Sequence, residues 1–233
     1  MRGRKAAGRE NTMREMRVTG RGRLSVKPDR IRLILNLSDT KKDYAKALQA
    51  SAEMGGKLQK LFCGCGFAEE DLKTTNFFVD AQYEGYNDKD GNWKQRFVGY
   101  RFEQSLKIEF PVDNERLGKI LYELAASGVQ TEFRIQYTVS DPEACRNELL
   151  ERAVYDAREK AVVLAKAGGV GLGAISSIDY SFGNREIYSE PVNFRSMKCA
   201  AAEDSVGAFG MNIVADNIDL DDSVTVCFEM ETL

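Results

Sequence analysis

Hydrophobic and polar positions follow two different periods along the chain. Strict alternation predicts seven strands, at residues 16–26, 31–37, 72–86, 93–110, 131–139, 178–182 and 224–230. A spacing of three and four predicts three helices, at residues 40–62, 113–127 and 142–168. Because several strands follow one another through short turns and show one polar face, the pattern predicts an α+β fold built on antiparallel sheet.

The clearest local signals surround the long helix in the C-terminal half. Asp141 is suited to cap its first free N–H groups, Pro142 suits the first helical position, and Gly168 with Gly169 predicts its end. The apolar stripe is predicted to pack close to a sheet or another helix, and it comprises Leu150, Ala153, Val154, Ala157, Ala161, Leu164, Ala165 and Gly168. The opposite face, with Glu148, Arg152, Asp156 and Lys160 alternating in sign, is predicted to be solvated.

Two further local features carry structural predictions. Gly20 and Gly22 interrupt the first strand and indicate either a bulge or a close approach of another backbone. Thr40 and Asp43 resemble a capping box at the start of the first helix.

Two sequence motifs resemble ligand sites and fail on closer reading. The run from Asp88 to Asn92 begins like a calcium loop, but Trp93 stands where the sharp turn needs glycine and Gly99 where the bidentate carboxylate belongs. Asp90-Gly91 between two alternating runs predicts a plain hairpin turn. The glycines at 169–173 follow a helix and precede a strand, the reverse of a dinucleotide-binding motif.

Composition removes most catalytic and metal chemistry from consideration. The 233-residue chain contains no histidine, which excludes His-activated nucleophiles and His-containing metal sites. Its five cysteines lack framework spacing and are interpreted as reduced thiols, and Cys63-x-Cys65 would need two more soft ligands to hold zinc. We therefore assign no catalytic, cofactor-binding or metal-binding residue and expect no cofactor.

Charge is unevenly distributed. Residues 1–32 hold eleven basic and three acidic side chains, a net charge of +8, whereas the whole chain carries −3. Arg14, Arg17, Arg21 and Arg23 are therefore candidates for binding an anionic partner. The alternatives are an ordinary strand with outward arginines, or pairing of opposite charges between subunits; no aromatic residues are interleaved with the arginines for base stacking.

The remaining patterns concern organisation and location. Residues 1–13 are predicted to be a disordered basic tail and residues 14–233 one α+β domain. With no run of about 18 apolar residues, no membrane span is expected, and because residues 1–17 lack the apolar segment of a secretory signal, the sequence predicts a cytoplasmic protein. The long hairpin and the irregular loop at 184–211 are candidate subunit contacts, with Tyr86, Trp93 and Phe97 as candidate assembly residues.

Taken in order, four segments resemble the SIMPL-domain family, a bacterial family long described as a domain of unknown function. They are VTGRGRLSVKPDRIRLILNLS at 18–38, TTNFFVDAQYEGY with VGYRFEQSLKI at 74–108, ERAVYDAREKAVVLAKAGGVGLGAI at 151–175, and DDSVTVCFEM at 221–230. The resemblance, which spans about residues 14–232, implies an α+β fold with a long helix and a tendency to form large closed homo-oligomers. It supplies no catalytic residue, and it implies a periplasmic or cell-envelope location from which this chain departs.

These observations support one leading hypothesis. The chain is predicted to be a non-enzymatic, self-assembling structural or interaction protein that forms a homo-oligomer. The alternative is a binding module that takes nucleic acid or acidic lipid through its arginine-rich first strand. An enzyme using carboxylates ranks third, since no carboxylate pair can be nominated from spacing.

Overall fold

The computed structural model describes residues 14–180, 187–189 and 215–232. These residues form three α-helices, one short 3₁₀ helix and seven strands in two antiparallel sheets, which confirms the predicted α+β class. The described chain divides into two compact units, one built from residues 14–26, 141–180, 187 and 217–232 and the other from residues 27–140, 188–189 and 215–216. The prediction of one domain over 14–233 stays a prediction, and the tail at 1–13 and most of the loop at 184–211 lie outside the described residues.

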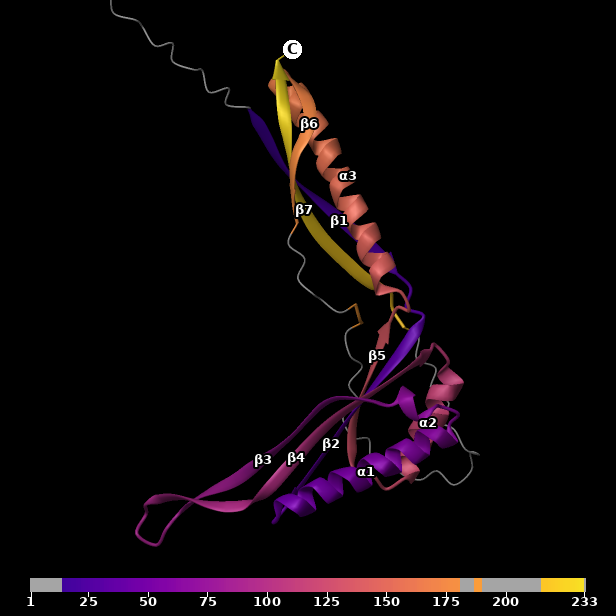
Figure 1. Cartoon of the computed structure of the whole chain (residues 1–233), viewed down its shortest axis with the longest axis vertical. Coiled ribbons are helices and arrows are strands. Elements are labelled where there is room, and N and C mark those ends of the chain that lie inside the picture. Colours follow the sequence, from indigo (N-terminus) through magenta and orange to yellow (C-terminus); the bar gives the residue numbers. More distant parts are fainter. Residues whose placement is uncertain (1–13, 181–186, 190–214, 233) are drawn as a thin grey trace, which may run out of the picture. The chain divides into compact units, whose positions relative to one another are not determined.

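The first unit is a three-stranded sheet with one long helix on one face (Figure 1). The strand order is β1-β7-β6, where β1 is Glu15–Val26, β7 is Ile218–Thr232 and β6 is Val170–Asp179. The helix α3, Pro142–Gly168, begins and ends as predicted, since the Asp141 side chain accepts a hydrogen bond from the Ala144 amide at 2.9 Å and Gly169 adopts a left-handed φ of 64°.

The contact between α3 and β1 is a close backbone approach rather than a bulge. The β1–β7 register is unbroken from Glu15 to Val26. A Cβ atom on Gly20 would lie 2.0 Å from the Ala153 carbonyl oxygen, and one on Gly22 would lie 2.1 Å from that of Leu149. Glycine is therefore needed at both positions because the helix backbone occupies the space of a side chain. This outcome selects one of the two predicted explanations.

The buried face of α3 differs in part from the predicted stripe. Its most buried residues are Leu149, Ala153, Ala157, Ala161 and Ala165. Alanine at every fourth position lets the helix backbone approach the sheet, whereas Leu164 stays 51% exposed. Leu150 and Val154 of the predicted stripe are partly buried and pack against the same core, so the prediction holds for them and not for Leu164.

The second unit is a four-stranded sheet packed against two helices (Figure 1). Its strand order is β3-β4-β2-β5, and its elements are β2 (Arg30–Lys41), α1 (Tyr44–Gly64), η1 (Glu69–Asp71), β3 (Lys73–Asn87), β4 (Trp93–Pro111), α2 (Asn114–Ala126) and β5 (Thr131–Thr138). Alternate residues of β2, Ile31, Leu33, Leu35 and Leu37, are fully buried at the centre of its core. Apolar burial of this kind is the main source of stability in such a unit.

The predicted capping box at Thr40 and Asp43 is wrong. Strand β2 continues through Lys41, so Thr40 belongs to the sheet. Asp43 occupies the N-cap of α1 without a capping hydrogen bond, because its carboxylate binds Lys46 Nζ at 2.8 Å instead. That ion pair also lowers the pKa of Asp43.

Candidate functional site

The β3–β4 hairpin of the second unit is the most exposed structured segment of the described chain. Nearly every residue of β3 is exposed, and so are the first six of β4. At the tip, Asp88 Oδ1 accepts hydrogen bonds from the amides of Asp90 and Asn92 at 3.0 and 2.9 Å, and Gly91 has a φ of 79°. The Asp88 carboxylate also binds Lys94 at 2.7 Å, which lowers its pKa. The tip is thus the hydrogen-bonded turn that the sequence predicted.

A β-bulge in β4 decides which side chains share a face of the hairpin. Gln82 is paired with Gly99 and Tyr83 with Phe97, so Val98 is an extra residue on β4. Phe97 and Tyr100, three residues apart, would point to opposite faces of a regular strand. The extra residue brings them to the same face, where their ring centroids lie 5.2 Å apart.

Four of the aromatic rings on this face form a continuous chain. Tyr44, at the start of α1, contacts Tyr100 edge-on with a centroid distance of 5.5 Å. Phe97 contacts Tyr100 in turn and Tyr83 at 5.7 Å. Trp93 lies on the same face further out, since it alternates with Gln95 and Phe97, and its ring covers the backbone of Gly85. We call Tyr44, Tyr83, Trp93, Phe97 and Tyr100 the aromatic strip.

The strip combines order with exposure. Offset or edge-to-face ring pairs hold each other in place, and Gly85 provides the flat support for Trp93, since a Cβ atom there would lie 2.1 Å from the indole ring. Trp93 is nevertheless 69% exposed and Tyr83 is 60% exposed. A row of rigid, exposed aromatic side chains is typical of a surface that binds another surface, because such side chains bury large area at low entropic cost.

The other face of the hairpin is mixed in character. Tyr86 is paired with Lys94, so it lies on the opposite face from Trp93 and Phe97. Near it, Arg96 donates two hydrogen bonds to Glu84 Oε2, at 3.1 and 2.7 Å, and this pair raises the pKa of Arg96. The structure therefore brings together two of the three predicted assembly residues, Trp93 and Phe97, and separates Tyr86 from them.

The candidate anion-binding arginines lie on or beside β1 in the first unit. Val18, Gly20 and Gly22 face α3, so Arg17, Arg21 and Arg23 point to the other face of the sheet. Arg14 lies just before the strand and its carbonyl oxygen accepts a hydrogen bond from the Met230 amide at 2.8 Å. The structure thus places three of the four arginines on one face of the sheet, which no helix of the described residues covers.

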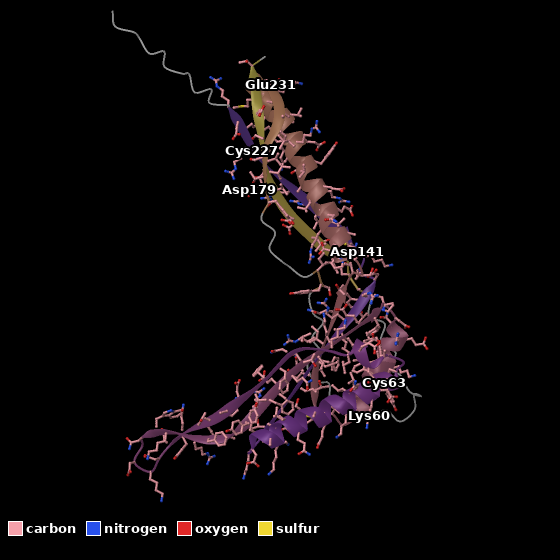
Figure 2. All side chains as sticks on the ribbon, viewed as in Figure 1. Lys60, Cys63, Asp141, Asp179, Cys227 and Glu231 are labelled. Atoms are coloured by element: carbon pink, nitrogen blue, oxygen red, sulfur yellow. The ribbon has the colours of Figure 1, made fainter. Side chains whose placement is uncertain are left out.

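That face already carries acidic partners from the neighbouring strands. Arg17 contacts Asp179 of β6 at 3.4 Å, Arg23 is paired in register with Asp221 of β7, and Ser25 donates to Asp219 at 2.6 Å (Asp179 is labelled in Figure 2). Such exposed pairs contribute little stability, but they reduce the positive potential that would attract a polyanion. Anion binding by these arginines stays a prediction.

The charged face of α3 makes contacts that the sequence prediction did not include. The Arg21 amide donates to Asp156 Oδ2 at 2.6 Å, Arg152 donates to the Arg23 carbonyl oxygen at 2.7 Å, and Lys160 donates to that of Thr19 at 3.4 Å. These bonds satisfy main-chain groups at the outer edge of β1, because among the strands that the structure describes β1 pairs only with β7. The face is therefore partly exposed but structurally engaged, rather than simply solvated.

The opposite flank of α3 presents an apolar surface that sequence reasoning missed. Tyr155 is more than half exposed, and a shallow hollow beside it is lined by Leu150, Glu151, Val154 and Arg158. Val162 and Val163, also more than half exposed, line a different hollow together with Asp156 and Lys160. Tyr155, Val162 and Val163 lie outside the predicted stripe, so the sequence analysis assigned them no role. The excess of apolar positions over what one sheet contact can bury was the available signal.

Cys63, Cys65 and Cys227 are free thiols. Cys63 is exposed near the end of α1 and Cys227 is on β7 (Figure 2). Burial raises the pKa of the Cys65 thiol, with a further contribution from Glu123, so this thiol is a poor nucleophile at neutral pH. Within the described ranges no group of three His, Cys, Asp or Glu side chains could hold a metal ion, and no helix is long and apolar enough to cross a membrane.

Comparison with known proteins identifies relatives along nearly the whole chain. A family model, SIMPL, described as a protein of unknown function (DUF541), matches residues 16–228. The chain is 30% identical over 217 residues to the 26 kDa periplasmic immunogenic proteins of Brucella melitensis and Brucella abortus, covering 92% of this chain and 84% of theirs. It is 23% identical over 212 residues to the uncharacterized protein YggE of Edwardsiella ictaluri, covering 91% and 85%. The Brucella names overturn the predicted cytoplasmic location, since both place the relative in the periplasm.

Proposed function

The chain belongs to the SIMPL family, and from that premise we propose that it is a self-assembling structural or interaction protein of the periplasm whose subunits associate through the β3–β4 hairpin. The location follows the names of the Brucella relatives. The proposed activity is association and not catalysis, and the residues assigned to it are Trp93 and Phe97 of the aromatic strip.

The single observation that carries the proposal is the apolar area left exposed on the hairpin. Six aromatic side chains of β3 and β4 are between 37% and 69% exposed, namely Phe77, Phe78, Tyr83, Tyr86, Trp93 and Phe97. At about 200 Å² for each whole side chain, roughly half of it exposed, they present about 600 Å² of surface over the two faces of the hairpin. The largest apolar patch of an ordinary monomer is about 300–600 Å² and includes many residue types.

This area matches what a stable interface needs. A standard interface buries about 800 Å² on each partner, of which a little over half is apolar. The four aromatics on the face of the strip, Phe77, Tyr83, Trp93 and Phe97, would alone supply about 440 Å² of it, at about 200 Å² per side chain. Because aromatic residues lie on both faces of the hairpin, a monomer in water would leave both uncovered, whereas an assembly covers them.

Light scattering coupled to size-exclusion chromatography tests the proposal. The wild-type chain should elute as a discrete species of several times its 26.1 kDa mass. The variant carrying Trp93→Ala and Phe97→Ala should shift to the mass of one chain, because it loses the two strip residues nearest the tip. The matched control carries Val162→Ala and Val163→Ala on α3, which are also more than half exposed, and should keep the wild-type mass. A wild-type chain that runs as a monomer at high concentration would refute the proposal.

A further inference from the structure

Strand β3 leaves one of its two edges unpaired. It is the outermost strand of the order β3-β4-β2-β5, and no other strand among the described residues pairs with its outer side (Figure 1). Its 15 residues span about 50 Å at 3.3 Å per residue. An edge of this length offers a row of free N–H and C=O groups that can template another strand. Native proteins usually block such an edge with proline or many charges, and β3 contains no proline.

Two charged residues on this edge strand lack an ion-pair partner within the described part of the chain. Lys73 is paired in register with Lys107, a residue of like charge. Asp80 is paired with Arg101, but the Arg101 guanidinium contacts Glu103 at 3.0 Å. No carboxylate of the described residues lies within 4.0 Å of Lys73 and no cation within 4.0 Å of Asp80. With respect to the described residues, the strand thus carries one cation and one anion without an ion-pair partner, seven residues apart.

A second bulge brings these two side chains to the same face. Thr75 is an extra residue on β3, since Thr74 is paired with Leu106 and Asn76 with Ser105. Residues seven positions apart would face opposite ways in a regular strand, and the extra residue reverses this. Both Lys73 and Asp80 therefore point away from the core. Directly opposed residues of antiparallel strands must share a face, so the two side chains meet this requirement.

We infer that the β3 strands of two copies of this chain pair antiparallel along their outer edges, with Lys73 of each copy beside Asp80 of the other. This inference rests on the proposed function and specifies its partner, the same hairpin of a second copy. The arrangement is two-fold symmetric, forms two ion pairs from otherwise unpaired charges, and places the axis beside Phe77. It joins the two four-stranded sheets into one continuous sheet. A parallel arrangement would instead place Lys73 beside Lys73 and Asp80 beside Asp80. In the antiparallel arrangement each strand carries both the cation and the anion that its partner needs.

Carbodiimide cross-linking tests this geometry directly. The reagent joins an amine to a carboxylate only when the two are in contact. Within one chain, Lys73 and Asp80 lie about 23 Å apart along the strand, at 3.3 Å per residue, so a Lys73–Asp80 isopeptide bond must connect two copies. Equal mixing of ¹⁴N- and ¹⁵N-labelled chains confirms this by mass spectrometry, because the linked peptides then carry both labels. Lys94 and Asp88, 2.7 Å apart within one chain, are the internal positive control.

Charge-reversal variants provide a second test of the edge pairing. Lys73→Glu should raise the dissociation constant of the assembly about tenfold at low salt, since two attractive pairs become repulsive. The double variant Lys73→Asp with Asp80→Lys should restore the wild-type mass by exchanging the charges. Lys60→Glu, on the exposed surface of α1 (Figure 2), is the matched control for charge alone and should change nothing.

The outcomes separate the two proposals. An assembled wild-type protein with the mixed-label Lys73–Asp80 link and rescue by the charge exchange supports the edge pairing. The edge pairing is overturned, and self-assembly left standing, if the assembled protein gives the Lys94–Asp88 link without the Lys73–Asp80 link. The same holds if Lys73→Glu leaves the dissociation constant of the assembly unchanged. A protein that is monomeric at all concentrations overturns both.

Discussion

Replacing Gly20 by alanine should disrupt the packing of α3 against β1. The added methyl carbon would lie 2.0 Å from the Ala153 carbonyl oxygen, 2.5 Å from the Ala157 amide nitrogen and 2.8 Å from the Ala157 Cβ. An ordinary contact between a methyl carbon and an oxygen is about 1.3 Å longer than the first of these, on the scale of optimal non-bonded separations. Two of the three atoms belong to the helix backbone, so no side-chain rotation relieves the clash and the helix must withdraw.

The magnitude follows from what the withdrawal removes. A gap of 0.5–1 Å forfeits a quarter to a half of the dispersion attraction across a packed contact. The same movement stretches two hydrogen bonds, from the Arg21 amide to Asp156 Oδ2 at 2.6 Å and from Arg152 to the Arg23 carbonyl oxygen at 2.7 Å. Overpacking of a buried contact costs about 1–3 kcal/mol. Because the obstacle here is backbone, we expect the loss in free energy of unfolding to be about 3 kcal/mol.

Urea denaturation followed by circular dichroism measures the total loss, and hydrogen–deuterium exchange of α3 peptides locates it. The second measurement is needed because the only tryptophan, Trp93, reports on the other unit. Gly56→Ala in α1 is the matched control, since no atom lies within 4 Å of the added methyl group, and it should stabilise the protein by about 0.5–1 kcal/mol through helix propensity. If Gly20→Ala leaves the stability within 0.5 kcal/mol of wild type and α3 exchange unchanged, the close-approach argument is refuted.

Three other predictions follow from particular contacts. The pKa of Asp156 is lowered, first by its bond from Lys160 and then by the Arg21 amide, so Asp156→Asn should destabilise the protein at neutral pH, and a pH series of urea midpoints should show the difference vanishing as the pH falls below the ordinary value of 3.8. The Tyr137 hydroxyl is buried without a hydrogen-bond partner among the described residues, so Tyr137→Phe should leave the thermal midpoint unchanged or raise it, and a clear fall would contradict the assignment. Gly85→Ala should displace the Trp93 ring and shift its fluorescence emission maximum, whereas an unchanged spectrum would show that the indole does not cover Gly85.

The parts of the fold that the sequence predicted are those decided by neighbouring residues. Asp141, Pro142 and Gly169 define the ends of α3 through bonds within one or two turns, and alternation along β2 identifies its buried leucines. The start of β7 shows the limit of such reasoning. Its first residues include Asp219, Asp221 and Asp222, which are poor strand formers on propensity. They form a strand because they pair with β1, nearly 200 residues away, where Ser25 lies opposite Asp219 and Arg23 lies opposite Asp221.

The candidate site depends on two features that periodicity cannot reveal. Alternation alone puts Phe97 and Tyr100 on opposite faces of β4, and it does the same to Lys73 and Asp80 on β3. One extra residue in each strand, at Val98 and at Thr75, reverses both assignments. A bulge is a property of pairing between two strands and leaves no mark in the hydrophobic pattern of either. The sequence could therefore show that the hairpin is rich in aromatic residues, whereas only the register shows that these residues form one strip and that the unpaired charges share a face.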